Sequence, residues 1–167
     1  MAPRLVLIGP MGAGKTTVGK AIASELGVDF ADTDALIEAD QGKTVSEIFV
    51  EDGEAHFRLV EESIVIDALL ESSGVLSLGG GSVMNDEVQK ALRATSARKV
   101  FLDINLSAVA PRVGFDTARP LLMVNPRQKW AELMSQRRPT YESLADLKIE
   151  VSEKSVSEIT AEIIGAL

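Results

Sequence analysis

The residues with the clearest chemical potential form the segment GPMGAGKT, Gly9 to Thr16. Its glycines allow a tight turn whose backbone N–H groups point inward, at the start of a helix, where phosphate oxygens are favoured. In this pattern Lys15 reaches the β- and γ-phosphates, and the Thr16 hydroxyl suits Mg²⁺. We therefore predict a nucleotide phosphate loop whose ligand contacts come from Gly12, Ala13, Gly14, Lys15, Thr16 and Thr17.

Two acidic residues, Asp32 and Asp34, follow the next short apolar run. A phosphate loop still needs a carboxylate on the Mg²⁺ side and a group that accepts a proton from the acceptor hydroxyl. Asp32 suits the first role and Asp34 the second, although both could simply cap a helix. The third apolar run carries Ser77 where an ordinary Walker B strand has aspartate, which leaves Asp32 as the main carboxylate near the metal.

A run of three glycines, Gly79 to Gly81, follows the third apolar run. Each glycine adds conformational entropy to the unfolded chain, so a run of three lowers the stability of the folded state. Glycine does permit close approach of a ligand to the backbone. We expect these three residues to form a loop that a ligand approaches.

Several arginines could bind an acidic ligand, but their spacing leaves alternatives open. Arg58 has acidic residues three and four positions later, so it is equally consistent with a surface ion pair. Arg137 and Arg138 precede Pro139 and could be basic residues at a helix C-terminus. The sole tryptophan, Trp130, is expected to pack a helix rather than to stack on a ligand.

Arg112 and Arg119 bracket or lie within a loop long enough to act as a lid, residues 114–125. A kinase must exclude water from the transferring phosphoryl group, or it hydrolyses ATP. A closing loop that carries an arginine would both exclude water and stabilise the transferring group. We expect Arg119 to contribute to catalysis in this way.

The elements that must position these residues alternate between short apolar runs and longer amphipathic ones. Helices are expected at 15–26, 34–41, after Thr44, at 54–70, after Asn85, at 107–113, from Pro126 until Pro139 interrupts it, and at 155–167. Strands are expected at 5–8, 28–31, 75–78, 99–104 and 147–151. This order predicts a three-layer α/β fold with a five-stranded parallel sheet and ligands at the carboxyl ends of its strands.

Composition narrows the class of protein. The 167 residues, 46% of them hydrophobic, suit one domain. A net charge of −8 argues against nucleic-acid and anionic-membrane partners, which need a basic face. The absence of cysteine and of any apolar run of about 18 residues agrees with a cytoplasmic protein, expected to be a monomer that acts on a small molecule.

Taken together, the motifs resemble those of the shikimate kinases, which have the fold of the nucleoside monophosphate kinases. The resemblance rests, in order, on GPMGAGKTT at 9–17, DTD at 32–34, FR at 57–58, LGGGSV at 78–83, ARPLL at 118–122 and RRPTY at 137–141. It implies transfer of the γ-phosphoryl group of ATP to the 3-hydroxyl of shikimate, on the route to chorismate and aromatic amino acids. It also implies an acceptor-binding helical region at about residues 34–61 and a lid at about residues 114–125.

The resemblance assigns roles residue by residue. It implies that shikimate contacts Asp34, Arg58, Gly80 and Arg137, and that Lys15 and Arg119 serve the phosphates; Gly79 and Gly81 are substrate-binding candidates as members of the same glycine loop. Mg²⁺ would be held by Thr16 and, through water, by Asp32, while Arg112 would lie against adenine. The approach to the last helix differs from related chains, which often carry arginine and proline there; Lys154 is the candidate adenine contact.

Two alternatives remain open from the sequence. Another small-molecule kinase, for gluconate or a nucleoside monophosphate, would keep the phosphate loop and change the acceptor contacts. A nucleotide-dependent regulator would bind nucleotide without an acceptor. The absence of an Asn-Lys-x-Asp guanine motif argues against a GTPase.

Overall fold

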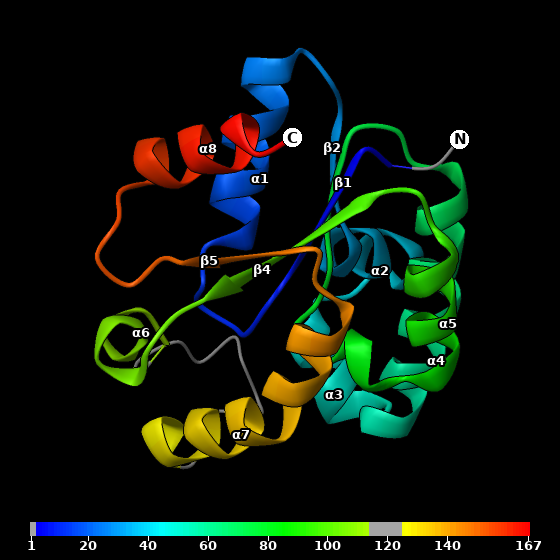
Figure 1. Cartoon of the computed structure of the whole chain (residues 1–167). Coiled ribbons are helices and arrows are strands. Elements are labelled where there is room, and N and C mark those ends of the chain that lie inside the picture. Colours follow the sequence, from blue (N-terminus) through cyan, green and yellow to red (C-terminus); the bar gives the residue numbers. More distant parts are fainter. Residues whose placement is uncertain (1–2, 114–124) are drawn as a thin grey trace.

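A computed structural model describes residues 3–113 and 125–167 and shows a parallel sheet at the centre of the fold (Figure 1). The five strands have the order β2-β3-β1-β4-β5, so the predicted five-stranded parallel sheet is confirmed. All four residues of the central strand are buried, as expected for a strand covered on both faces. The strands are β1 (Leu5–Ile8), β2 (Phe30–Asp32), β3 (Val75–Ser77), β4 (Arg98–Asp103) and β5 (Leu147–Glu150).

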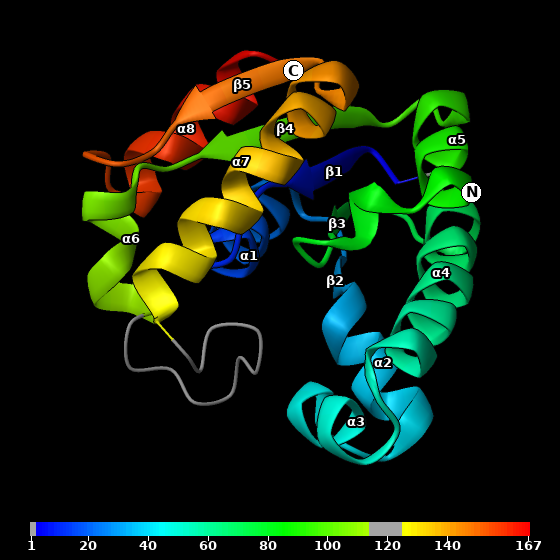
Figure 2. The same ribbon diagram turned by 90° about the horizontal axis from the view of Figure 1, so that it is seen from below.

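Helices cover both faces of the sheet. Helix α1 packs beside α8 on one face, whereas α4, α5 and α7 form the other layer (Figure 1, Figure 2). The crossovers therefore bring the carboxyl ends of β1, β2 and β3 to one edge. The helices are α1 (Lys15–Leu26), α2 (Thr33–Gln41), α3 (Val45–Glu51), α4 (Glu54–Glu71), the short 3₁₀ helix η1 (Ser82–Met84), α5 (Asp86–Ala94), α6 (Leu106–Val113), α7 (Pro126–Leu144) and α8 (Val156–Gly165).

The second strand begins later than the sequence predicts. Gly27 ends α1 in the left-handed conformation, with φ of 64°. The next N–H group, that of Val28, donates a hydrogen bond to the Ala23 carbonyl at 3.0 Å. Val28 thus belongs to the turn that ends the helix, so the second strand exists but its predicted bounds, 28–31, are wrong, and β2 covers Phe30–Asp32.

The prediction that Pro139 interrupts its helix is also wrong. Helix α7 continues through Pro139 to Leu144, although an interior proline costs about 3 kcal/mol. Tyr141 and Leu144 beyond it are buried, and each large apolar side chain contributes about 1.5–3 kcal/mol. Packing therefore overrides the local preference, and Arg137 lies within the helix rather than at its C-terminus.

A small second core holds the helices that follow β2. Ile37, Ile48 and Phe57, one from each of α2, α3 and α4, form an apolar cluster apart from the main core. This cluster packs the predicted acceptor-binding region into one unit. Within 3–113 and 125–167, no helix is both long enough and apolar enough to cross a membrane.

Candidate functional site

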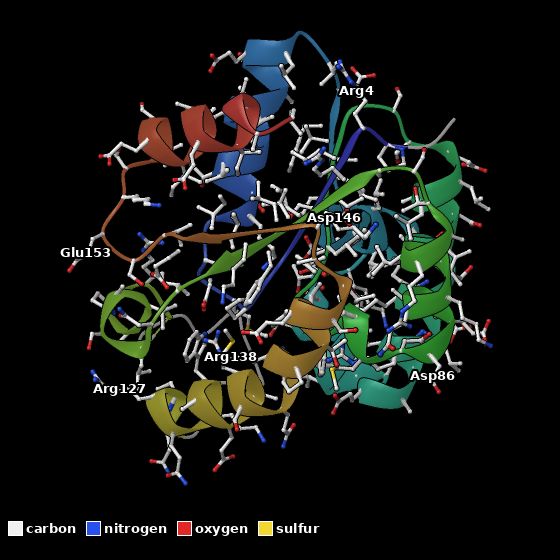
Figure 3. The ribbon with its side chains drawn as sticks, viewed as in Figure 1. Arg4, Asp86, Arg127, Arg138, Asp146 and Glu153 are labelled. Carbon is white, nitrogen blue, oxygen red and sulfur yellow. The ribbon has the colours of Figure 1, made fainter. Side chains whose placement is uncertain are left out.

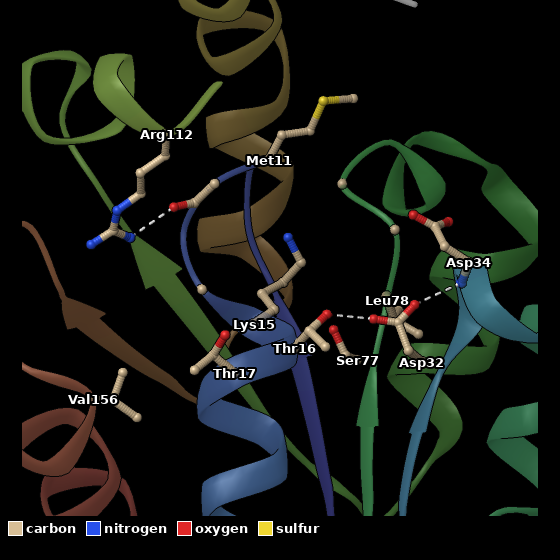
Figure 4. Close-up of a pocket in the computed structure, with 14 residues that line it drawn as sticks. Met11, Lys15, Thr16, Thr17, Asp32, Asp34, Ser77, Leu78, Arg112 and Val156 are labelled. Carbon is tan, nitrogen blue, oxygen red and sulfur yellow. Dashed lines mark hydrogen bonds between the residues drawn. The ribbon is translucent and has the colours of Figure 1, made fainter. Parts of the chain in front are cut away.

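The phosphate loop connects β1 to α1 and lines a pocket of about 400 Å³ (Figure 4). Gly9, Gly12 and Gly14 have φ values of 146°, 83° and 90°, a region that other residues rarely adopt. Lys15 folds back over the loop, where its Nζ donates to the carbonyls of Gly9 at 2.8 Å and Pro10 at 2.9 Å. The ammonium group is therefore held at the loop, as phosphate binding requires.

Asp32 both caps a helix and contacts the phosphate loop. One of its carboxylate oxygens accepts the N–H groups of Asp34 at 2.9 Å and Ala35 at 3.4 Å. The other accepts the Thr16 hydroxyl at 2.6 Å (Figure 4). The two functions suggested by the sequence, helix cap and metal-side carboxylate, are thus compatible in one residue.

The Thr16–Asp32 pair fits Mg²⁺ bound together with a nucleotide. Mg²⁺ prefers oxygen ligands and usually keeps several waters, so one or two protein oxygens are enough beside the phosphates. In the described part of the chain, no group of three or more histidine or acidic side chains forms a metal cage. The pair would hold a nucleotide-bound ion and is not suited to hold an ion alone.

Of the other predicted nucleotide contacts, Arg112 lies at the nucleotide pocket and Lys154 does not. Arg112 lines the pocket and donates to the Gly12 carbonyl at 2.9 Å (Figure 4). Lys154 does not line this pocket, and its Nζ lies 2.7 Å from Glu162. Arg119 and all of the predicted lid except Asn125 lie outside the described residues.

The glycine turn after β3 separates the nucleotide pocket from a second pocket of about 410 Å³. Gly79 and Gly80 line the first pocket and Gly81 lines the second. A Cβ at Gly81 would lie 2.8 Å from the guanidinium nitrogens of Arg58 and 2.9 Å from Nη2 of Arg137. The two arginines, from α4 and α7, therefore converge on one point beside the phosphate loop.

A carboxylate that the sequence interpretation did not single out completes this cluster. Glu61 is only 3% exposed and lies 2.7 Å from Nη1 of Arg58. Burial raises the pKa of Glu61, while the nearby Arg58 opposes the rise. Glu54 lines the same pocket and lies 3.5 Å from Nη2 of Arg58, so two guanidinium groups and two carboxylates face this pocket, and of the two carboxylates only that of Glu61 is buried.

Asp34 lies beside Gly79, at the start of the glycine turn. A Cβ at Gly79 would lie 2.9 Å from Oδ1 of Asp34 and 3.1 Å from Oε2 of Glu61. Asp34 also lines the nucleotide pocket (Figure 4). The Asp34 carboxylate thus lies close both to the nucleotide pocket and to Glu61, the ion-pair partner of Arg58.

Arg137 and its neighbour Arg138 have different surroundings. Arg137 is 6% exposed and lines the second pocket. Arg138, which is labelled in Figure 3, instead makes a two-pronged ion pair with Asp103 at the end of β4, with distances of 2.8 and 2.9 Å. This hydrogen-bonded pair raises the pKa of Arg138 and fixes α7 to the sheet.

Comparison with known proteins gives a consistent result. The profile of the family described as "Shikimate kinase" matches residues 11–167. A "Shikimate kinase" of Thermobifida fusca (strain YX) is 51% identical over 163 residues, which cover 98% of this chain and 93% of that protein. Another, of Salinispora arenicola (strain CNS-205), is 44% identical over 100% of this chain and 99% of its own length.

Solved structures agree with the sequence matches. "Shikimate kinase from Acinetobacter baumannii in complex with shikimate" has a TM-score of 0.94 at 34% identity, covering 99% of this chain and 93% of that one. A gluconokinase from Sinorhizobium meliloti 1021 has a TM-score of 0.60 at 21% identity, covering 98% and 89%. The second likeness concerns the fold alone.

Proposed function

Because this chain belongs to the shikimate kinase family, we propose that it transfers the γ-phosphoryl group of ATP to the 3-hydroxyl of shikimate. The products are ADP and shikimate 3-phosphate, an intermediate on the route to chorismate and aromatic amino acids. The observation that carries this proposal is the convergence of Arg58 and Arg137 on Gly81, across the glycine turn from the phosphate loop. An acidic alcohol held there would present a hydroxyl to a bound nucleotide.

On the nucleotide side, the backbone of residues 12–17 would bind the phosphates and Lys15 would contact the β- and γ-phosphates. Thr16 would bind Mg²⁺ directly and Asp32 would hold it through water. The ion supplies charge neutralisation of the phosphate oxygens when it is bound. The contribution of the chain is to hold Thr16, Asp32 and Lys15 in fixed positions before the substrates arrive.

On the acceptor side, the guanidinium groups of Arg58 and Arg137 would grip the shikimate carboxylate. A guanidinium is planar and can donate two charge-assisted hydrogen bonds to one carboxylate. The buried Glu61 holds Arg58 in place. Gly79, Gly80 and Gly81 leave room for the ring of the acceptor beside the backbone, since a side chain at 79 or 81 would meet the charged groups.

Asp34 would orient the acceptor hydroxyl and accept its proton. Phosphoryl transfer passes through a loose transition state in most analyses, so positioning and electrostatic stabilisation dominate its catalysis. Asp34 lies between the glycine turn and the nucleotide pocket, which is where the attacking oxygen must be aligned. Its ionised form also favours the hydroxyl orientation in which a lone pair points toward the phosphate.

The remaining contacts belong to the closed complex. We expect Arg119, on the lid at about residues 114–125, to stabilise the transferring phosphoryl group and to help exclude water. Arg112 is close enough to the loop to lie against adenine. Lys154 would contact adenine only after it leaves Glu162.

We also propose a cytoplasmic monomer without nucleic-acid or membrane partners. The net charge of −8 disfavours association with nucleic acid or anionic lipid.

A coupled assay of ADP formation tests the proposed function. Purified protein is given ATP and Mg²⁺ with shikimate, gluconate, a nucleoside monophosphate or no acceptor. We expect ADP formation with shikimate to exceed that with the other acceptors by at least about 100-fold in kcat/KM. Preference for another acceptor would refute the substrate, and ADP formation that no acceptor stimulates would favour a regulator.

A further inference from the structure

Helix α7 contacts both halves of the site through one buried face. Trp130, Met134, Arg137 and Tyr141 recur every three or four residues and are all buried. The first and last of these side chains each donate a hydrogen bond to a backbone carbonyl outside the helix. Trp130 donates to Met11 of the phosphate loop at 2.9 Å, and Tyr141 donates to Gly80 of the glycine turn.

We propose that Trp130 and Tyr141 are positioning residues: Trp130 holds the nucleotide half of the site, and Tyr141 holds the acceptor half. Neither was singled out for this role by the motifs, and the proposal rests on the proposed function only for the identity of the two substrates. Its basis is the geometry of two peptide groups, one in each loop.

The Tyr141 hydroxyl controls the peptide group between Gly80 and Gly81. A peptide group is planar, and in its trans form the N–H points away from the preceding carbonyl. A fixed Gly80 carbonyl therefore fixes the direction of the Gly81 N–H, in the residue whose Cβ position faces the guanidinium groups of Arg58 and Arg137. The anchor thus sets how the glycine turn faces the acceptor pocket.

Tyr141 is well suited to be a permanent donor. It is fully buried, and its ring stacks on Phe101 with a centroid separation of 5.0 Å. Burial raises the pKa of Tyr141 to about 12, so the hydroxyl keeps its proton at neutral pH. The hydroxyl can therefore hold the Gly80 carbonyl throughout the catalytic cycle.

Gly80 lies between the phosphate loop and the acceptor arginine. A Cβ added there would lie 3.4 Å from the Gly9 carbonyl of the phosphate loop and 3.4 Å from Nη1 of Arg137. A tilt of the Gly80 peptide would change its contacts with both neighbours, and the Tyr141 hydroxyl also interacts directly with Arg137. Loss of the Tyr141 anchor should therefore be felt at the acceptor arginine.

Trp130 acts in the same way on the phosphate loop. The indole N–H is a donor only, and it fixes the Met11 carbonyl. The same peptide group carries the Gly12 N–H on its opposite side, in the part of the loop that we expect to bind phosphate. Trp130 therefore orients a nucleotide contact, whereas Tyr141 orients an acceptor contact.

Two conservative variants test this division. Trp130→Phe and Tyr141→Phe each remove one donor and keep an aromatic ring, while Met134→Leu changes the same helix face without removing a hydrogen bond. KM for ATP and KM for shikimate are measured for all three variants, with thermal midpoints. Calorimetric titrations with ADP and with shikimate are run below the thermal midpoint of each variant. They show which of the two ligands binds more weakly, even in a variant that is less stable than the wild type.

We expect Trp130→Phe to raise KM for ATP by about threefold to tenfold with KM for shikimate changed less than about twofold, as for one lost hydrogen bond. Tyr141→Phe should show the reverse preference, and Met134→Leu neither. Equal changes in both KM values, or lowered midpoints with no change in either, would overturn the inference. If the wild type shows no shikimate-dependent turnover, the proposed function fails instead, and the ADP titrations alone decide the role of Trp130.

Discussion

Replacement of Arg137 by lysine tests the acceptor site most sharply, because charge is kept and geometry is lost. Arg137 is 6% exposed, and its guanidinium group lies beside both Gly80 and Gly81. Lysine supplies one hydrated point charge in place of a planar fork and so loses one of two charge-assisted hydrogen bonds. A loss of about 1.4 kcal/mol corresponds to a rise of about tenfold in KM for shikimate.

The assay measures kcat and the KM values for ATP and for the acceptor. The acceptor is either shikimate or an analogue that lacks the carboxylate. Arg138→Lys is the matched control, because it makes the same change one residue later at an ion pair with Asp103. It should lower the thermal midpoint and leave KM for shikimate unchanged. An equal rise of KM in both variants, or a wild type that treats the two acceptors alike, would refute the carboxylate clamp.

Three further changes probe the other groups. Lys15→Ala should lower kcat at least about 100-fold, since a fixed cation on the transferring group is worth about 3 kcal/mol; near-normal turnover with a native circular dichroism spectrum would reject the role. Asp34→Asn should lower kcat by about 10²–10⁴-fold if Asp34 accepts the proton, whereas a rise in shikimate KM alone would make it a binding residue. Burial raises the pKa of Glu61 above 4.5, so the folded protein keeps a proton on Glu61 at pH values where the unfolded chain loses it. Relative to Glu61→Gln, the free energy of unfolding of the wild type should therefore fall as pH rises above about 4.5. Urea unfolding of both proteins between pH 4 and about 8 checks this, and parallel pH profiles would contradict it.

The fold was largely predictable from the sequence because its strands are short and separated by helices, and because β1 is continuously apolar. One error came from the local turn that ends α1 at Gly27, and the other came where a longer-range contact overrides a local preference. Pro139 has a strong local tendency to end a helix, but α7 continues because residues beyond it are buried against the sheet. No property of the segment alone reveals that packing partner.

The candidate site was predictable in its residue types and less so in its supports. Motif spacing placed Asp34, Arg58 and Arg137 among the candidates, and the structure brings them to one glycine turn. Glu61 could have been found, because it falls four residues after Phe57 on the buried face of α4. The partners of Trp130 and Tyr141 could not, since each donates to a backbone carbonyl of a distant loop and a backbone carbonyl has no sequence signature.

A crystal structure of the complex with shikimate, Mg²⁺ and a non-hydrolysable ATP analogue tests the central claim most directly. We predict that the shikimate carboxylate contacts the guanidinium groups of Arg58 and Arg137. The 3-hydroxyl should lie within hydrogen-bond distance of Asp34 and in line with the γ-phosphorus. A carboxylate bound elsewhere, or another hydroxyl facing the γ-phosphate, would contradict the proposed arrangement.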